Sequence, residues 1–457
     1  MEPYELLLKC INGIYSNKFI YLNSNEPEIL GSGTFESFGV TGSFQNAQLE
    51  PIHTKIEYKG DYFISDLSSQ KGTWLKINPN DTLLLSLSDQ LKIGNIILTI
   101  TALDLTIPAL ELTWGVKKIV IGKSLKISSK NPTEYIFPAL AYFSIEILLE
   151  NSMYMVKVIN GTISKRIIGE TKIIPGYEIE IGALEFEVCR YNYGKWSNIG
   201  LRPSMEDADC IRQDLGICHE PVSYYAVFDG HGGNTCADYL KDNLYKYMQK
   251  YLKGINDIQE WKNFIGQAFN ECDLAFSKNF PEVSKVMGST ALVVMMIGRN
   301  VVVANTGDCR AVMSRRGEAI QLTNDHKPDA ADEKARIESA GGFVTSGRVL
   351  SKLGVSRSFG DFNFKHPKKT IICDPEISIF DLNIHQDEFI ILGCDGLFEA
   401  HTNQELTTNI RDRLKRMRIT EQDPCKVIKD IVTGAAHSRK TADNVTSILI
   451  TLSAGIC

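Results

Sequence analysis

The chain has 457 residues, more than one ordinary domain holds, so we expect two or three domains. Its 43% hydrophobic and 23% charged residues are typical of a soluble globular protein, and a net charge of −6 argues against nucleic-acid binding. Eleven scattered cysteines indicate a reducing compartment, so a cytoplasmic or nuclear location is expected. No spanning segment, signal peptide or lipid-attachment motif is visible, and we expect no membrane partner.

Short apolar runs separated by turn residues predict strands through the first 190 residues. A weak internal repeat is present, because "DQLKIGNIILTI" resembles "YEIEIGALEFEV" and "ILGSGTFESFG" resembles "VIGKSLKISSK". The glycines of the first pair, Gly94 and Gly182, lie 88 residues apart, and those that open the second pair lie 91 apart. Two nearly equal offsets predict two copies of one all-β module, at 1–106 and 107–190.

From residue 191 onward, strand-like runs alternate with long helical ones. In the segment 236–252, apolar residues recur at helical spacing, which predicts a helix with one buried face. The segments 258–278, 329–340 and 402–417 also show a helical pattern. We therefore predict a third domain of mixed composition, at 191–457.

Acidic residues beside glycine are the first functional signal in this domain. The run "YYAVFDGHGG" predicts a strand that stops at Asp229, followed by Gly230 and His231. Clustered carboxylates repel one another unless a cation joins them, and oxygen ligands suit Mg²⁺ or Mn²⁺. Two such ions about 3.5–4 Å apart can activate a shared water and clamp a phosphoryl group. The acidic candidates are Glu206, Asp207, Asp209, Asp229, Asp308, Asp395, Glu399 and Asp443.

The successive motifs of residues 193–452 resemble those of the metal-dependent Ser/Thr protein phosphatases, the PPM or type 2C family. The motifs are "RPSMEDAD", "YYAVFDGHGG", "GSTALVV", "ANTGDCRAV", "NDHKPD", "GRVLSKLGVSRSFGD", "CDGLFE" and "DNVTSILI". The resemblance implies an α+β fold, with a catalytic β-sandwich of two antiparallel sheets flanked by helices. It also implies hydrolysis of phosphoserine and phosphothreonine in phosphoprotein substrates through a metal-bridging hydroxide. Two Mg²⁺ or Mn²⁺ ions per domain, and a weaker third, would be the cofactors.

The same resemblance implies metal ligands at particular residues. Asp229 would bridge both metals, and Gly230 would bind one through its backbone carbonyl, which no Cβ shields. Asp308, together with Asp395, would hold the weaker third ion. One position departs from the family, because Glu399 stands where an aspartate is usual, and this affects only the third site. The implied ligands are Glu206, Asp229, Gly230, Asp308, Asp395 and Asp443.

Three further residues would act on substrate or water by the same resemblance. Arg202 would grip the substrate phosphate through the forked donors of its guanidinium group. Asp207 would order metal-bound water, and His231 would protonate the leaving serine or threonine oxygen. These assignments predict an enzyme that forms no covalent intermediate.

Two rival interpretations concern the same domain. "CRAVMSR", from Cys309 to Arg315, matches the Cys-x5-Arg loop of thiolate phosphatases, but its interior is typical of a strand and we regard the match as chance. A catalytically impaired scaffold with the phosphatase fold is the alternative function. Such a scaffold would be expected to lack Asp229, Asp395 or Asp443, and all three are present.

The first N-terminal repeat resembles a forkhead-associated (FHA) domain. Residues 62–77, "YFISDLSSQKGTWLKI", contain Asp-Leu-x-Ser and then Gly-Thr, with His53 upstream and the hairpin sequence "LKIGNIILTI" downstream. The second repeat resembles the same domain more faintly. The resemblance implies two all-β FHA-like sandwiches ahead of the catalytic domain, used for targeting or autoregulation. We interpret His53 as a structural residue.

Both modules depart from the FHA family where that family binds phosphothreonine. Ser32 and Lys123 replace an arginine, Glu50 and Pro51 replace a serine and an arginine, and Lys71 replaces an asparagine. A phosphate of about −2 charge needs forked cationic donors, which these positions do not supply. We therefore expect the modules to bind a protein partner or the catalytic domain, and not phosphothreonine in the usual manner.

Overall fold

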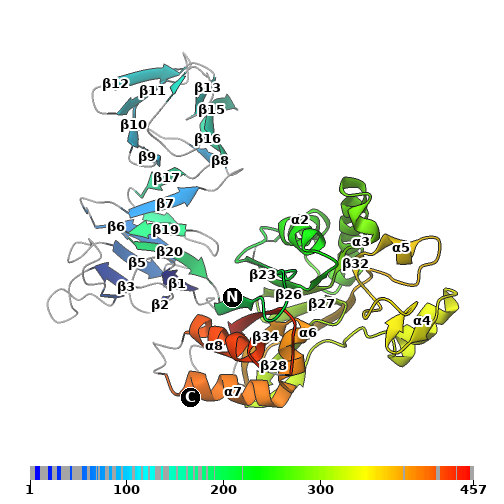
Figure 1. Ribbon diagram of the computed structural model, residues 1–457. Helices are drawn as coiled ribbons and strands as arrows, with labels where there is room; N and C mark the ends of the chain where they lie inside the picture. Colours follow the sequence, from blue (N-terminus) through cyan, green and yellow to red (C-terminus); the bar gives the residue numbers. More distant parts are fainter. Residues whose placement is uncertain are drawn as a thin grey trace. The chain divides into compact units, whose positions relative to one another are not determined.

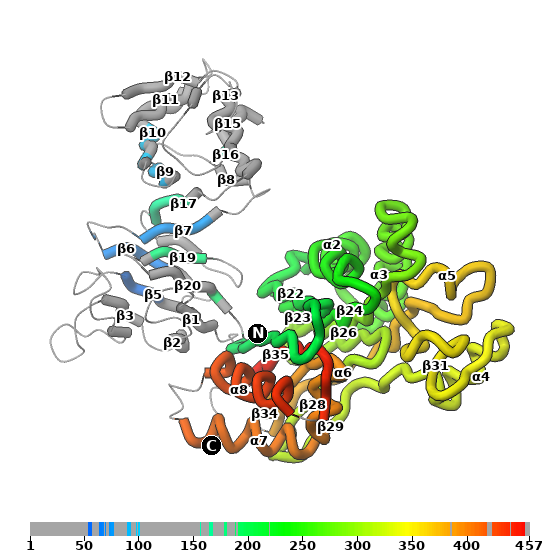
Figure 2. Tube along the Cα trace, viewed as in Figure 1, coloured from blue at the N-terminus to red at the C-terminus, as the bar shows by residue number. Residues whose placement is uncertain are grey.

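The protein forms two compact units, Met1–Val188 and Cys189–Cys457 (Figure 1). The computed structural model describes residues 191–452 except 219, 384–385, 418–422 and 439. Before residue 190 it describes strands β1 to β20 and residues 67, 69, 89 and 167. Figure 2 shows the Cα trace of the second unit, coloured from green to red along the chain.

The described elements of the first unit are all strands, arranged in three sheets. A ten-stranded sheet has the order β12 (Lys117–Ile121), β11 (Ala109–Trp114), β10 (Ile96–Asp104), β9 (Gln90–Ile93), β17 (Ile163–Arg166), β7 (Thr73–Ile77), β19 (Glu178–Ile181), β20 (Leu184–Cys189), β1 (Leu6–Cys10) and β2 (Phe19–Leu22). A second sheet has the order β14 (Tyr135–Ile136), β13 (Ser124–Ser128), β15 (Ser144–Glu150), β16 (Met153–Asn160) and β8 (Thr82–Leu84). The third has the order β18 (Glu170–Lys172), β6 (Tyr62–Asp66), β5 (Thr54–Tyr58), β3 (Glu28–Gly31) and β4 (Gly42–Ser43).

The pairing in this unit joins strands from both halves of the sequence repeat. Strand β17 pairs with β7 and β9, β18 pairs with β6, and β8 pairs with β16. The limit expected between 1–106 and 107–190 therefore does not separate the sheets, because strand pairing depends on which edges meet in space and not on chain order. The repeat appears as two equivalent hairpins, β9–β10 and β19–β20. The strand pairing nearest the turn is Ile93↔Ile96 in the first hairpin and Ile181↔Leu184 in the second.

The turn after β6 is held together by Asp66. Its carboxylate accepts hydrogen bonds from the main-chain N of Ser69 (2.8 Å) and of Thr73 (2.7 Å). Thr73 is buried, and its hydroxyl lies 2.7 Å from that of Thr54 on β5. These motif residues thus stabilise the connection between β6 and β7. The positions that bear on phosphothreonine binding lie outside the described residues: Ser32, Glu50, Pro51, His53, Lys71 and Lys123.

The second unit contains two five-stranded antiparallel sheets. One has the order β21 (Asn192–Asn198), β35 (Val445–Thr451), β34 (Asp387–Gly393), β28 (Arg310–Arg315) and β29 (Glu318–Gln321). The other has the order β22 (Ala208–Arg212), β23 (Ser223–Phe228), β26 (Ala291–Ile297), β27 (Asn300–Thr306) and β33 (Glu376–Asp381). Short strands form two smaller sheets, β24 (Gly230–His231) with β25 (Gly288–Ser289) and β32 (Phe359–Gly360), and β30 (Val344–Thr345) with β31 (Arg348–Val349).

Helices cover the outer faces of this sandwich (Figure 1). One sheet is covered by α2 (Thr235–Leu252), α3 (Trp261–Asn279) and the 3-10 helix η2 (Val283–Lys285), and the other by α6 (Asp395–Ala400), α7 (Asn403–Lys415) and α8 (Pro424–Ala436). The helices α4 (Ala331–Ser339) and α5 (Phe362–Lys365) lie beside the sandwich (Figure 1). The helices expected at 236–252, 258–278, 329–340 and 402–417 correspond to α2, α3, α4 and α7. None of the described helices is long and apolar enough to cross a membrane.

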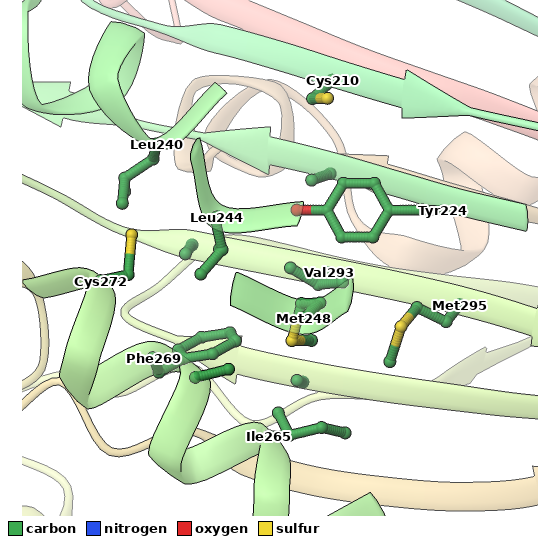
Figure 3. Close-up of a cluster of buried hydrophobic side chains, with 14 of the residues drawn as sticks. Cys210, Tyr224, Leu240, Leu244, Met248, Ile265, Phe269, Cys272, Val293 and Met295 are labelled. Carbon is green, nitrogen blue, oxygen red and sulfur yellow. The ribbon is translucent and has the colours of Figure 1, made fainter. Parts of the chain in front are cut away.

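Strand β23 shows why the sheets are buried on both faces. Tyr224, Ala226 and Phe228 pack in a cluster with α2 and α3, which Figure 3 shows in part. Tyr225 and Val227 point to the opposite face and pack with residues of the other sheet. The expected α+β class and the sandwich flanked by helices are confirmed.

A separate small core beside α4 consists of Ile337, Val349 and Ile371.

Candidate metal centre and catalytic residues

The acidic candidates gather at one end of the sandwich because of where the strands begin and end. Asp229 directly follows β23, Asp308 comes just after β27, and Asp395 just after β34. Asp207 directly precedes β22, and Asp443 lies just before β35. The pairings Ala208↔Phe228 and Gly393↔Ser447 place the ends of neighbouring strands side by side at one end of each sheet. Residues more than 200 positions apart in sequence are thereby brought together.

Asp229 is common to two groups of side chains with the spacing of a metal site. Potential ligand atoms of Asp229, Asp308 and Asp395 all lie within 4.8 Å of one another, and so do those of Asp207, Asp229 and Cys394. Oδ2 of Asp207 is buried and has no hydrogen-bond partner among the described residues. A buried oxygen without a donor is costly unless a cation or water meets it. The arrangement therefore fits a divalent cation.

Burial and mutual repulsion raise the pKa of these carboxyl groups. Desolvation, and then neighbouring carboxylates, raise the pKa of Asp207 and that of Asp395 to about 7. Burial and the charges of its neighbours raise the pKa of Asp229 well above its usual range. Burial also raises the pKa of the Cys394 thiol well above its usual value, so Cys394 stays neutral. A hard oxygen-ligand set of this kind suits Mg²⁺ or Mn²⁺.

Gly230 and Glu206 lie against each other beside this cluster. A Cβ at Gly230 would lie 2.3 Å from the carbonyl oxygen of Glu206, so only glycine fits there. The Glu206 carboxylate accepts hydrogen bonds from the main-chain N of Gly233 (3.1 Å) and from Oγ of Ser204 (3.0 Å). Its main-chain N donates to Asn444 (2.8 Å). Glu206 belongs to neither group of closely spaced ligand atoms in the described part of the chain.

Asp443 forms an ion pair with Arg202 in this structure. Nη2 of Arg202 donates to Oδ2 of Asp443 at 2.6 Å, and the Arg202 side chain is 55% exposed. Asp443, like Glu206, lies outside both groups of closely spaced ligand atoms. The main-chain N of Asn444 donates to the other carboxylate oxygen of Asp443 (2.8 Å). The phosphate-binding candidate and a ligand candidate are thus in direct contact.

His231 meets a carboxylate that the sequence reasoning did not single out. Its Nε2 lies 2.7 Å from Oδ2 of Asp361, and Asp361 is buried. Burial lowers the pKa of His231, but the charge and hydrogen bond of Asp361, with the charges of Asp308 and Glu206, together raise it by more, and the net pKa is raised. Asp361 closes the motif "GVSRSFGD", which was noted only for the family resemblance. Its position in that motif gave no sign of the contact.

Lys327 is the second side chain that the sequence reasoning missed. Its ammonium group contacts Asp308 and lies 3.7 Å from Oδ2 of Asp395, so it stands between the two proposed ligands of the third ion. Burial lowers the pKa of Lys327, but Asp308, Asp395 and Asp325 together raise it by more, so the net pKa is raised. Arg310 donates two hydrogen bonds to Asp325, two residues before Lys327, at 3.1 and 2.6 Å, which fixes this segment. Glu399 is exposed on α6.

The Cys-x5-Arg match has the structure of a strand. Residues 310–315 form β28, paired with β29 and β34. Cys309 is fully buried, its Sγ lies 3.1 Å from Oγ1 of Thr290, and burial raises its pKa well above the usual value. A nucleophilic cysteine needs a stabilised thiolate, so this segment is not a phosphate-binding loop.

Residues 191–445, more than half of the chain, match the family described as "Protein phosphatase 2C". The chain belongs to the protein phosphatase 2C family. It is 35% identical over 312 residues to "Probable protein phosphatase 2C 22" of Arabidopsis thaliana, covering 64% of this chain and 76% of that protein. It is 39% identical over 264 residues to "Probable protein phosphatase 2C 69" of Arabidopsis thaliana, covering 57% and 70%.

A solved structure titled "Structure of a C.elegans sex determining protein" has the same fold. It aligns with a TM-score of 0.52 at 24% identity, over 57% of this chain and 65% of that one. The expected family and the expected enzyme class, a Ser/Thr protein phosphatase, are confirmed by the family match and the relatives. This phosphatase is accordingly of the PPM type, and its family implies phosphoprotein substrates.

Proposed function

We propose that this phosphatase hydrolyses phosphoserine and phosphothreonine with two Mg²⁺ or Mn²⁺ ions bound at the carboxylate cluster, and with a weaker third ion. The convergence of Asp207, Asp229, Asp308 and Asp395 carries the proposal. Burial raises the pKa of each of these carboxyl groups, and so do neighbouring carboxylates, whose charge the protein's own cations only partly offset. The proposed ligands are Glu206, Asp229, Gly230, Asp308, Asp395 and Asp443.

The protein's own side chains bind the phosphate and orient the attacking water. When bound, the cations supply positive charge to the phosphoryl group and acidify the attacking water. Arg202 binds the phosphate, because among the described residues its guanidinium donates one hydrogen bond, to Asp443, and its other N–H groups can take phosphate oxygens. Asp207 orients the attacking water through Oδ2, the oxygen that has no partner in the described part of the chain.

His231 is the proposed general acid. A serine or threonine alkoxide leaves poorly, so a proton must reach the ester oxygen as the bond to phosphorus breaks. The raised pKa of His231, caused by Asp361 against the effect of burial, favours the protonated form that can supply it. His231 adjoins Gly230 on β24, next to the proposed metal ligands.

A purified full-length protein tests this proposal. We expect it to dephosphorylate a phosphothreonine peptide when Mn²⁺ or Mg²⁺ is present and to lose that activity in excess chelator. Calorimetric titration with Mn²⁺ should show binding that Asp229→Asn removes. Activity that persists in chelator, or that Cys309→Ser abolishes, would overturn the proposal. Mn²⁺ binding without any hydrolysis would favour the impaired scaffold instead.

We also propose that residues 1–190 contain FHA-like modules that bind a protein partner or the catalytic domain. The Asp66 turn supports this, because the residues of the FHA-like motif, Asp66, Ser69 and Thr73, hold the β6–β7 connection. The sequence supports the lack of phosphothreonine binding, since Ser32 and Pro51 replace arginines of that family and Glu50 replaces a serine with a negative charge. We propose 1–106 and 107–190 as the two copies of the repeat, whose strands share sheets, and 191–457 as the phosphatase domain.

A further inference from the structure

A small three-stranded sheet brings His231 and Asp361 together across 130 positions of sequence. Strand β24, which contains His231, pairs with β25, and β25 pairs with β32, which directly precedes Asp361. His231 lies opposite Gly288, and Gly288 lies opposite Gly360. A Cβ at Gly288 would lie 2.2 Å from Oδ2 of Asp361 and 2.6 Å from Nε2 of His231. Only glycine at this position leaves room for the contact.

The carboxylate of Asp361 is fixed from several directions. It is 2% exposed, and Oγ of Ser358 donates to the same Oδ2 atom that faces His231, at 2.6 Å. Its main-chain N donates to the carbonyl of Met287 (3.1 Å). Its backbone has φ 53°, a left-handed conformation that is uncommon outside glycine and that aspartate adopts more readily than most residues. Asp361 is thus held in place independently of His231.

The segment that carries Asp361 is anchored to α3. The main-chain N of Gly360 donates to Oδ1 of Asp273 at 2.7 Å, and both groups are buried. Oδ2 of Asp273 accepts from Lys365 on α5, at the other side of Asp361 in the chain. Asp273 therefore accepts hydrogen bonds from residues on both sides of Asp361 in the chain.

We propose that Asp361 is the positioning residue for His231 and that Nδ1 is the atom that delivers the proton to the leaving oxygen. A carboxylate only accepts hydrogen bonds, so Nε2 of His231 must carry a hydrogen that points to Asp361. Nδ1 is then the ring nitrogen that exchanges its proton with substrate. This inference rests on the proposed role of His231 as general acid.

The contact between His231 and Asp361 fixes the orientation of the imidazole ring, which burial alone would not do. An imidazole can rotate about its side-chain bonds, and each rotation would move the transferable proton relative to the leaving group. Misplacing a catalytic group by about 1 Å can cost about a hundredfold in rate. A buried carboxylate opposite Nε2 removes that freedom and fixes which nitrogen is protonated in the neutral ring. Asp361 itself need not contact substrate.

Comparing two substrates separates positioning from a purely structural role. Asp361→Asn should lower kcat on a phosphothreonine peptide about tenfold or more, with KM little changed. The same variant should change kcat on p-nitrophenyl phosphate less than about threefold, because an aryl oxide leaves without a proton. Mn²⁺ affinity should match the wild type. Asp332→Asn, an exposed carboxylate on α4, is the matched control and should leave both substrates unaffected.

A double-mutant cycle completes the test. In a His231→Ala background, Asp361→Asn should add no further loss on the peptide, since the group it positions is gone. Equal losses on both substrates, or additive losses in the cycle, would show a structural role and overturn the inference. If the wild type is active and His231→Ala impairs only the peptide reaction while Asp361→Asn does nothing, the proposed function stands and this inference fails.

A measurement on the wild type keeps the inference testable if Asp361→Asn does not fold. In protein labelled with ¹⁵N-histidine, the signals lost in His231→Ala belong to His231. We expect the neutral ring to be protonated at Nε2 and to have a bare Nδ1. A ring protonated at Nδ1 overturns the inference, whether or not the enzyme is active.

Discussion

The properties of single residues in this phosphatase are set by how many carboxylates share one small volume. Asp207, Asp229, Asp308 and Asp395 repel one another, and burial removes the water that would screen them. Lys327 offsets part of this charge through its contacts with Asp308 and Asp395. The cluster therefore favours bound cations. Replacing one of its carboxylates by a neutral side chain should change cation affinity more than the stability of the fold.

The ligand role of Asp395 can be separated from general charge effects on α6. Asp395→Asn should weaken Mn²⁺ binding and lower turnover by about a hundredfold or more, because it removes one of the few charges that hold the ion. Calorimetry and steady-state kinetics measure the two effects. Glu399→Gln removes an exposed carboxylate from the same helix and should change both by less than about threefold. Similar losses in the two variants would contradict a ligand role confined to Asp395.

Lys327 should compete with cations for the third site. Lys327→Met leaves Asp308 and Asp395 without their internal partner, so we expect tighter binding of an additional Mn²⁺ ion. The number of bound ions and their affinities can be followed by calorimetry or by electron paramagnetic resonance of Mn²⁺. Lys334→Met on α4 is a control for loss of one surface charge. Unchanged or weaker Mn²⁺ binding in Lys327→Met would contradict the prediction.

The raised carboxyl pKa values predict an unusual pH dependence for the metal-free protein. Asp207 and Asp395 have a pKa of about 7 when folded, against an ordinary value of 3.8. The folded state therefore binds their protons more tightly than the unfolded state, and these groups reduce the free energy of unfolding as pH rises from about 4 to about 7. Denaturant melts in chelator should show this loss. Excess Mg²⁺ should reduce it, and a metal-free protein that gains stability over this range would contradict the assignment.

At the scale of elements, strand ends and short connections bring the candidate catalytic side chains together. The sheet β24–β25–β32 places His231 beside Asp361, and the ion pair of Asp273 and Lys365 joins α3 to α5 beneath it. Both members of that pair are buried, with side chains 5% and 9% exposed. A buried pair of this kind depends strongly on the presence of both partners.

Removing one member of that pair should therefore destabilise the fold. Lys365→Met leaves Asp273 charged and buried, and we expect a loss of about 3–5 kcal/mol in the free energy of unfolding. Urea melts measure the change. Lys250→Met, which breaks an exposed pair with Glu271, should leave the unfolding midpoint nearly unchanged. If Lys365→Met behaves like Lys250→Met, the buried pair is not an anchor of α5.

At the scale of the whole molecule, the question is what residues 1–188 add to the phosphatase unit. The two units are compact by themselves, and the first consists of strands wherever the structure describes its elements. At the FHA positions that bear on phosphate, the first module has Lys71 as its one cation by the sequence comparison. A single exposed cation contributes about 1 kcal/mol or less, too little to select a phosphopeptide.

We therefore predict that the first unit adds no affinity for phosphothreonine peptides. Full-length protein carrying Asp229→Asn, to suppress hydrolysis, should bind a phosphothreonine library no more tightly than residues 189–457 with the same change. Fluorescence anisotropy measures both, and the unphosphorylated library is the control. Micromolar, phosphate-dependent binding by the full chain that Lys71→Ala removes would restore phosphothreonine targeting.

The sequence by itself determined the family of the protein and singled out acidic residues that gather in the cluster. The continuous apolar run of β23, the apolar stripe of α2 and the acids beside glycine follow from local rules of period and sterics, which act over a few residues. These rules were enough to predict a domain of alternating strands and helices and to single out Asp229, Asp308 and Asp395, and the resemblance to the phosphatase family supplied the helix-flanked sandwich. They also identified the repeat that ends in the hairpins β9–β10 and β19–β20.

Only the tertiary structure decided which of those residues meet. Asp361 reaches His231, Lys327 stands between Asp308 and Asp395, and Arg202 is held by Asp443, and no local pattern marks these pairs. In the first unit, strands from both halves of the repeat share sheets, although the repeat predicted consecutive modules. The physical reason is the same in each case: contacts between distant segments depend on strand register, edge pairing and backbone conformation, which the chain acquires only when its sheets are assembled.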